Sequence, residues 1–237
     1  MKIALIGYGK MGKMIHEIIR QNSVHEIVDV FSSSNKPTVE KLKLAEVAIE
    51  FTQPETAVHH IKMCMDAGVP VVCGSTGWLS HLNEVEQYCS SANGSLIYAS
   101  NFSIGVNIFF ELNKKLAALM QNQQQYKIRM EEIHHTEKKD APSGTAISLA
   151  NDLIKINESK SRWVNHETEN KNELPVISIR KEAVTGTHII QYQSREDLIE
   201  IKHHAFNREG FAKGALLAAE LISQHKGVHS FTEILHL

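Results

Sequence analysis

The sequence of 237 residues has few cysteines and no long apolar segment. Its three cysteines, Cys64, Cys73 and Cys89, are odd in number and form no CxxC pair, which argues against a disulfide framework and favours a reducing compartment. No run approaches the roughly 20 apolar residues that cross a membrane, and Lys2–Ile6 leads directly into a glycine motif, unlike a secretory signal peptide. We therefore expect a cytoplasmic protein with no membrane partner.

The sequence also lacks a strong charge of either sign. Its formal net charge is −2, with 42% hydrophobic and 22% charged residues, as in an ordinary globular protein. This balance argues against nucleic acid as an obligate partner. The 14 histidines include three adjacent pairs, His59-His60, His134-His135 and His203-His204. None of these pairs has the H-x-x-x-H or Cys/His spacing of converging metal ligands, so no metal site is expected.

The first motif is rich in glycine and lies between an apolar strand, Ile3–Ile6, and a helical pattern that starts near Met14. It has the form GxGxxG and consists of Gly7, Tyr8, Gly9, Lys10, Met11 and Gly12. In this context the pattern is the fingerprint of a dinucleotide site, in which Gly9 lets the backbone approach a pyrophosphate. The alternative is a purely structural turn.

The second expected strand, Glu26–Phe31, indicates which dinucleotide binds. An NAD-selective domain usually ends this strand with an acid that holds the ribose hydroxyls. Here Ser32 and Ser33 follow the strand, with an amide and a lysine after them, and Asp29 lies inside the strand. These groups suit a 2′-phosphate, so NADPH, or both NADPH and NADH, is the expected cofactor. A solvated turn is the alternative.

Further strands are expected over residues 47–52, 69–74 and 96–99, each followed by a helical pattern. Five such β–α steps before residue 105 predict an α/β fold with a Rossmann-type doubly wound parallel sheet. Residues 126–133, 176–180, 188–192 and 198–201 predict four more strands, the last three as a meander, in a mixed sheet backed by helices. The polar residues 157–173 are expected to form an exposed connection.

The run from His134 to Thr145 carries most of the candidate chemistry. It follows a strand and contains His134, His135 and Lys138 before a Pro-Ser-Gly-Thr turn that opens a helix. The free backbone N–H groups of Gly144 and Thr145 at a helix start suit a carboxylate or phosphate. A histidine can exchange a proton near neutral pH and a lysine can neutralise an acid. A packed histidine and a solvated charge run are the alternatives.

This run, His-His-x-x-Lys-x-Asp-Ala-Pro-Ser-Gly-Thr-Ala from His134 to Ala146, resembles the signature of the 4-hydroxy-tetrahydrodipicolinate reductase (dihydrodipicolinate reductase) family. The resemblance implies an NAD(P)H-dependent oxidoreductase of lysine and diaminopimelate biosynthesis. It would reduce 4-hydroxy-tetrahydrodipicolinate, a small dicarboxylate, to tetrahydrodipicolinate with loss of water. The resemblance further implies that His134 and Lys138 are catalytic. The implied substrate-binding residues are His135, Gly144 and Thr145.

Other landmarks carry the resemblance over nearly the whole chain. It implies cofactor contacts in two more loops, which consist of Gly74, Ser75 and Thr76, and of Ala99, Ser100, Asn101 and Phe102. The implied dinucleotide-binding domain is residues 1–103 and 208–237, and residues 104–207 form a substrate-binding and oligomerisation domain of a homotetramer. The chain departs from the family pattern after the second strand, where the family commonly has Glu-Arg, and at Glu50, where it has Asp.

Two other functions share the glycine fingerprint. One is a different two-domain nicotinamide oxidoreductase that acts on an amino acid or sugar, and the other is a dinucleotide sensor without catalysis. Neither needs a His-His-x-x-Lys run before a Pro-Ser-Gly-Thr turn. A sensor would bind NAD(P)H without turnover, and its binding would not depend on Lys138.

Overall fold

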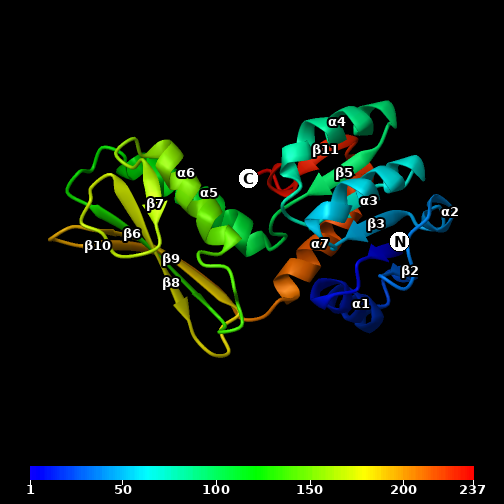
Figure 1. Cartoon of the computed structure of the whole chain (residues 1–237), viewed down its shortest axis with the longest axis horizontal. Helices are drawn as coiled ribbons and strands as arrows, with labels where there is room; N and C mark the ends of the chain where they lie inside the picture. The colour runs from blue at the N-terminus through cyan, green and yellow to red at the C-terminus, as the bar shows by residue number, and fades with distance from the viewer. The chain divides into compact units, whose positions relative to one another are not determined.

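The computed structural model describes all residues from Met1 to Leu237. The chain forms two compact units (Figure 1). Unit 1 consists of Met1–Ile104 and Glu209–Leu237, and unit 2 consists of Gly105–Arg208. None of the helices is long and apolar enough to cross a membrane.

Unit 1 is built on a six-stranded sheet with the order β11-β5-β4-β3-β1-β2, in which every paired strand is parallel. Its strands are β1 (Lys2–Ile6), β2 (Glu26–Phe31), β3 (Val47–Glu50), β4 (Val71–Cys73), β5 (Ser95–Tyr98) and β11 (Gly227–Ser230). The central strands are apolar except for Lys2 at the start of β1 and Glu50 at the end of β3, as expected of strands with both faces buried. The expected doubly wound parallel sheet is confirmed.

The helices of unit 1 cover both faces of this sheet. They are α1 (Lys10–Asn22), α2 (Val39–Leu42), α3 (Pro54–Asp66), α4 (Leu82–Ser91), α7 (Glu209–Leu221) and α8 (Phe231–Ile234). Alternate residues of β1 enter different cores: Ile3 and Leu5 pack with α1 and α7, whereas Ala4 and Ile6 pack with α3 and α4. This two-sided burial fixes the strand and so fixes the position of the glycine loop that follows it.

Strand β11 lies in a part of the chain for which the sequence predicts no strand. It pairs with β5 at the edge of the sheet, from Gly227 opposite Ser95 to Ser230 opposite Tyr98. Its four residues are all half-buried and include one aliphatic side chain, Val228, so they carry no strand pattern of their own. Pairing with β5 creates this strand.

Unit 2 contains a five-stranded sheet with the order β10-β9-β6-β8-β7. Its strands are β6 (Lys127–His134), β7 (Arg162–Val164), β8 (Glu173–Arg180), β9 (Gly186–Gln193) and β10 (Leu198–Ala205). The expected mixed sheet is confirmed, but the expected three-strand meander is wrong. Strand β8 pairs parallel to β6, and β6 lies between β8 and β9.

The expected exposed connection at 157–173 is also wrong in part, because it contains β7, whose Trp163 packs against the core.

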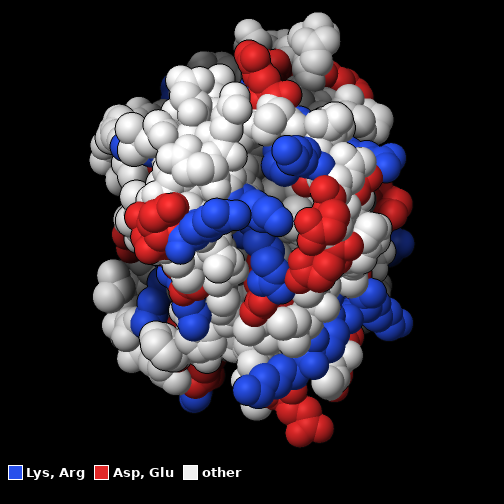
Figure 2. Space-filling view, turned by 90° about the vertical axis from the view of Figure 1, so that its left-hand side faces the viewer, with Lys and Arg blue, Asp and Glu red and all other residues white.

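Helices α5 (Ile104–Met120) and α6 (Gly144–Ile156) cover one face of the unit 2 sheet (Figure 1). Alternation along β6 turns Met130, Glu132 and His134 towards this covered face. The opposite face carries isoleucines such as Ile133 and Ile179, and neither helix covers it. Figure 2 shows positive and negative side chains next to one another, beside uncharged areas.

Candidate active site

The residues expected to bind a dinucleotide all follow strands of the unit 1 sheet. The glycine loop follows β1, Ser32 and Ser33 follow β2, Gly74–Thr76 follow β4 and Ala99–Phe102 follow β5. Because these strands are parallel, their carboxyl ends meet at one edge of the sheet, and the strand order reverses there between β1 and β3. In open α/β sheets, this is where ligands bind. The fold therefore brings the four segments to a common edge.

The three glycines of the first loop have different physical roles. Gly7 has a φ of +102°, and a Cβ there would lie 2.1 Å from the carbonyl oxygen of Phe51. A Cβ on Gly12 would lie 2.1 Å from the carbonyl oxygen of Gly7, so this glycine lets α1 approach the strand. A Cβ on Gly9 would meet nothing within 4 Å. Gly9 therefore serves no packing need, and the space beside it is open at the start of α1.

The end of β2 has no acidic side chain that is free to bind a ribose, because Asp29 has partners within the protein. Asp29 Oδ1 accepts hydrogen bonds from the backbone N–H of Val30 (2.8 Å) and from Nδ2 of Asn35 (2.9 Å). The carboxylate is thus held on its own strand. Ser32 and Ser34 join through their hydroxyls at 3.0 Å. This turn presents hydroxyl groups where an NAD-selective domain usually presents a carboxylate.

Glu50, at the end of β3, is fully buried and links two loops at the same edge. It accepts hydrogen bonds from the backbone N–H and the hydroxyl of Thr52 and from Sγ of Cys73. The N–H of Thr52 also donates to Oγ of Ser75, which places the loop after β3 against the loop after β4. Burial raises the pKa of Glu50, but hydrogen bonds, first that of His60, outweigh it, so the pKa lies below its usual range. Glu50 therefore remains a carboxylate.

In unit 2, helix α6 starts as the sequence predicts. Ser143 is the N-cap, and its hydroxyl accepts a hydrogen bond from the N–H of Ala146 at 3.2 Å. Gly144, the first helical residue, is exposed, and a Cβ there would meet nothing within 4 Å. The N-cap hydroxyl uses the N–H of Ala146, and the structure gives the N–H groups of Gly144 and Thr145 no acceptor. They are the groups that can bind an anion at this helix start.

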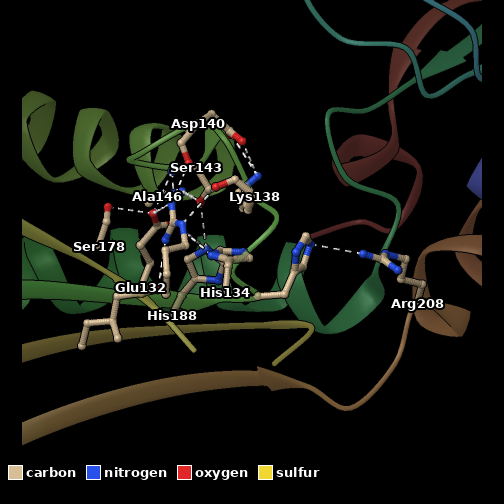
Figure 3. Close-up of polar contacts among 12 residues, drawn as sticks. Glu132, His134, Lys138, Asp140, Ser143, Ala146, Ser178, His188 and Arg208 are labelled. Carbon is tan, nitrogen blue, oxygen red and sulfur yellow. Dashed lines mark hydrogen bonds and ion pairs between the residues drawn. The ribbon is translucent and has the colours of Figure 1, made fainter. Parts of the chain in front are cut away.

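Strand register explains the cluster around His134. On the face covered by the helices, Glu132 of β6 lies between His188 of β9 and Ser178 of β8. In the next row, His134 pairs with Arg180 of β8. Figure 3 shows Glu132, His134 and His188 grouped together, close to Ser143. The imidazole rings of His134 and His188 meet edge to face at 5.2 Å.

Lys138 and His135 lie beyond the end of β6. Nζ of Lys138 is 2.8 Å from Oδ1 of Asp140, and its side chain is 22% exposed. Burial raises the pKa of Asp140, but Lys138 outweighs this effect, so that pKa lies below its usual value. Nε2 of His135 is 3.4 Å from Nη2 of Arg208, whereas His134 contacts Glu132. The two adjacent histidines therefore have different environments.

The sequence alone does not assign Glu132, His188 or Arg180 to the site. Arg180 pairs with the fully buried Glu132, with Nη2 3.3 Å from Oε1. One sequence signal was present: residues two apart on a strand share a face, so Glu132 and His134 belong together. No local signal places His188 beside them, because it comes from a strand 56 residues later in the chain.

Glu132, His134 and His188 place one possible ligand atom each within 4.8 Å of one another. The structure gives this carboxylate other partners, since it accepts from the N–H of Ser143, the hydroxyl of Ser178 and the guanidinium of Arg180. A neighbouring guanidinium disfavours a second cation. The carboxylate of Glu132 is thus satisfied by donors of the protein itself, and the expectation that the protein has no metal site stays a prediction.

The buried His188 gives unit 2 a testable pH dependence. Burial lowers its pKa to about 3, and the charge of His134 adds to this effect, although Glu132 opposes it. Below the ordinary histidine pKa near 6.5 the unfolded chain binds a proton that the folded chain does not, so stability falls as pH falls towards 3. We expect this residue to lower the free energy of unfolding by about 1.4 kcal/mol between pH 7.5 and 5.5.

Urea unfolding of the wild type and of His188→Asn at these two pH values measures this effect. The variant should lose about 1.4 kcal/mol less than the wild type over the interval. His204, an exposed histidine of β10, provides the control, since His204→Asn should keep the wild-type slope. Equal slopes for the wild type and His188→Asn would contradict a neutral His188.

Two family models match the chain in succession. The model described as "Dihydrodipicolinate reductase, N-terminus" matches residues 1–102, and the model described as "Dihydrodipicolinate reductase, C-terminus" matches residues 105–235. Together they account for nearly every residue, including both units of the structure.

Individual proteins agree with these family models. A 4-hydroxy-tetrahydrodipicolinate reductase of Christiangramia forsetii is 42% identical over 99% of this chain and 98% of its own length. Another, of Methanocorpusculum labreanum, is 34% identical over 100% of this chain and 99% of its own. Among solved structures, a dipicolinate-bound dihydrodipicolinate reductase of Paenisporosarcina sp. TG-14 is similar in fold, with a TM-score of 0.81, 22% identity and 98% coverage of each chain.

Proposed function

Because this chain belongs to the dihydrodipicolinate reductase family, we propose that it reduces 4-hydroxy-tetrahydrodipicolinate to tetrahydrodipicolinate and water, with NADPH or NADH as reductant. The observation that carries the proposal is the arrangement in unit 2. There, the Glu132–Arg180 pair contacts His134, the backbone of Lys138 and the N-cap Ser143 of α6. A Cβ on Gly144 would meet nothing within 4 Å, so the N-terminus of α6 has room for a carboxylate of a small dicarboxylate. The protein would supply binding, orientation and a proton, whereas the cofactor supplies a hydride.

We assign the roles of the unit 2 residues from the charge of each group and from its position in the structure. The substrate has two carboxylates, and the N–H groups of Gly144 and Thr145 would bind one of them at the start of α6. His135, which lies beside Arg208, would bind the other. Lys138 and His134 are the candidate acids, and one of them would protonate the hydroxyl that leaves ring carbon 4 as hydride arrives there. The departing group is then water.

For unit 1, we propose that the glycine loop holds the pyrophosphate. Its members Gly7 to Gly12 line the start of α1, and Gly9 leaves room for a close approach. Ser32 and Ser33 would contact the adenosine ribose or its 2′-phosphate, which favours NADPH or use of both cofactors. The loops Gly74–Thr76 and Ala99–Phe102, at the same sheet edge, would hold the nicotinamide half.

We propose that the protein acts as a cytoplasmic homotetramer. A reducing compartment fits the three cysteines, which are all buried and free. An assembly through unit 2 fits the face of its sheet that α5 and α6 leave uncovered, where Ile133, Ile177 and Ile179 are in part exposed. Burial of such isoleucines against another copy would be favourable.

A coupled assay tests the proposed reaction. The substrate is generated in place from pyruvate and aspartate semialdehyde by the preceding synthase, and the loss of nicotinamide absorbance is followed with NADPH and NADH side by side. We expect oxidation that requires the synthase, with NADPH used at least as well as NADH. Binding of either cofactor without synthase-dependent oxidation would contradict the proposal and would favour a sensor or a different substrate.

A further inference from the structure

A buried carboxylate in unit 2 takes no part in the chemistry proposed above. Glu132 has no exposed surface, although it lies two residues before His134 on β6. Removal of a carboxylate from water is unfavourable unless other groups replace its hydrogen bonds. The groups that replace water around Glu132 therefore indicate what this buried carboxylate does.

Glu132 has partners on three separate segments. Its two oxygens accept the N–H of Ser143 at 3.0 and 3.1 Å, and Oε1 also accepts the hydroxyl of Ser178 at 2.8 Å and Nη2 of Arg180 at 3.3 Å. Oε2 lies 3.2 Å from Nδ1 of His134 (Figure 3). Burial raises the pKa of Glu132, but neighbouring groups, first His134 and then Ser143 and Ser178, outweigh burial and hold the pKa well below its usual range. The group is an anion at neutral pH.

Two of these partners hold other parts of the candidate site. Ser143 caps α6, so its link to Glu132 fixes the helix start that presents Gly144 and Thr145. Arg180, besides pairing with Glu132, donates to the backbone oxygen of Lys138 at 3.3 Å and to that of Asp140. The turn that carries Lys138 is thus held against the same carboxylate.

The remaining partner is the ring of His134, which is 8% exposed. Oε2 of Glu132 lies 3.2 Å from Nδ1, and this contact is not aligned as a hydrogen bond. A carboxylate accepts but does not donate, so at this distance it would repel a lone pair on Nδ1 and favours the proton there. The other nitrogen, Nε2, faces Gly186 of β9, where a Cβ would lie only 3.1 Å away. The absence of a side chain at 186 leaves room for the ring in this orientation, and His188 supports it edge to face.

We propose that Glu132 is a positioning residue that keeps the Nδ1 proton of His134 in place, leaves Nε2 for the substrate, and aligns Lys138 and the start of α6 through Arg180 and Ser143. Its effect on rate rests on the proposed reductase function, whereas its effect on the tautomer of His134 does not. The two effects can therefore be measured apart.

Nitrogen-15 NMR of the histidine rings in the unliganded protein tests the tautomer. At a pH where the His134 ring is neutral, the wild type should show it with a protonated Nδ1, and a His134→Asn sample identifies its signals. In Glu132→Gln an amide N–H can face the ring, so we expect the Nε2–H tautomer to increase. Glu131→Gln is the matched control, since Glu131 is adjacent, faces the opposite side of the sheet and pairs with Arg129. An unchanged tautomer in Glu132→Gln would overturn the proposal.

Kinetics test the consequence for catalysis. We expect Glu132→Gln to lower kcat by about 10–100-fold, by analogy with the loss of a carboxylate that orients a metal-ligating histidine, with the Kd for NADPH near the wild-type value. A purely structural role would lower the melting temperature and the amount of folded enzyme, but not kcat per folded site. Glu131→Gln should retain the wild-type kcat.

If Glu132→Gln does not fold, Glu132→Asp is the variant for the same NMR and kinetic measurements. It keeps the negative charge beside Arg180 but withdraws the carboxylate from His134 by the length of one methylene. We expect a mixed tautomer and a smaller loss of kcat, and wild-type values of both would overturn the proposal. If the wild type itself does not reduce the substrate, the reductase function fails, and the NMR result alone decides the role of Glu132.

Discussion

Replacement of Lys138 with alanine is expected to lower kcat by roughly 10²–10⁴-fold, the range of general acid–base catalysis, and to leave the Kd for NADPH near the wild-type value. The side chain is in part exposed, and its ammonium group lies 2.8 Å from Oδ1 of Asp140. We expect this group to pair with a substrate carboxylate. The backbone of this turn is held by Arg180 and not by the lysine side chain. The fold should therefore survive the substitution.

Lys139→Ala is the matched control for this prediction. Lys139 is adjacent and exposed. Steady-state rates from the coupled assay and nicotinamide fluorescence titrations should show a large loss of kcat for Lys138→Ala alone. Near-wild-type turnover of Lys138→Ala would remove Lys138 from the mechanism.

His134→Ala should also lower kcat by roughly 10²–10⁴-fold. The double variant then shows whether the two residues serve one step, because residues that act as a unit have strongly non-additive effects on rate. A double variant no slower than the worse single variant would indicate a shared proton path through both side chains. Multiplied losses would indicate that one residue donates the proton and the other binds the substrate.

Replacement of Gly9 with valine is expected to weaken NADPH and NADH binding by roughly 10²-fold, as estimated from the loss of one or two hydrogen bonds to a charged phosphate. The backbone of Gly9 has a φ of −80° and a ψ of −158°, which valine can adopt. A side chain there would meet no protein atom near its Cβ, so it would fill the space left for the pyrophosphate. The melting temperature should stay near the wild-type value.

Gly12→Ala provides the comparison, because its Cβ would lie 2.1 Å from the carbonyl oxygen of Gly7. This variant should lose stability as well as cofactor affinity, since the strand and helix must separate. Titration of nicotinamide fluorescence and thermal unfolding of both variants separate the two effects. Unchanged cofactor affinity in Gly9→Val would disprove the assignment of this loop.

Local sequence patterns predicted the elements of this fold well where burial alone decides them. The apolar run Ile3–Ile6 and the glycine loop predicted β1 and the start of α1, because a buried parallel strand needs apolar residues on both faces. Likewise, Ser143 and the spacing after it predicted α6. Strands β7 and β11 were not predicted, because they are short and depend on pairing with β8 and β5.

The candidate site shows the same division. The motif from His134 to Thr145 predicted which side chains and which helix start carry the chemistry, because these residues are close in the chain. Their supports are distant in sequence. Arg180 and His188 come from β8 and β9, and whether they flank β6 depends on strand order and register, which residue spacing does not reveal.

By itself, the sequence determined the doubly wound sheet, the glycine loop and the types of residue that face a substrate. These features depend on the period of apolar residues and on local backbone needs. Only the tertiary structure decided that β6 lies between β8 and β9, and that Glu132 thereby joins His134, Arg180 and Ser143. The physical reason is that the hydrogen bonds of a buried carboxylate must come from segments that meet only once the sheet has formed.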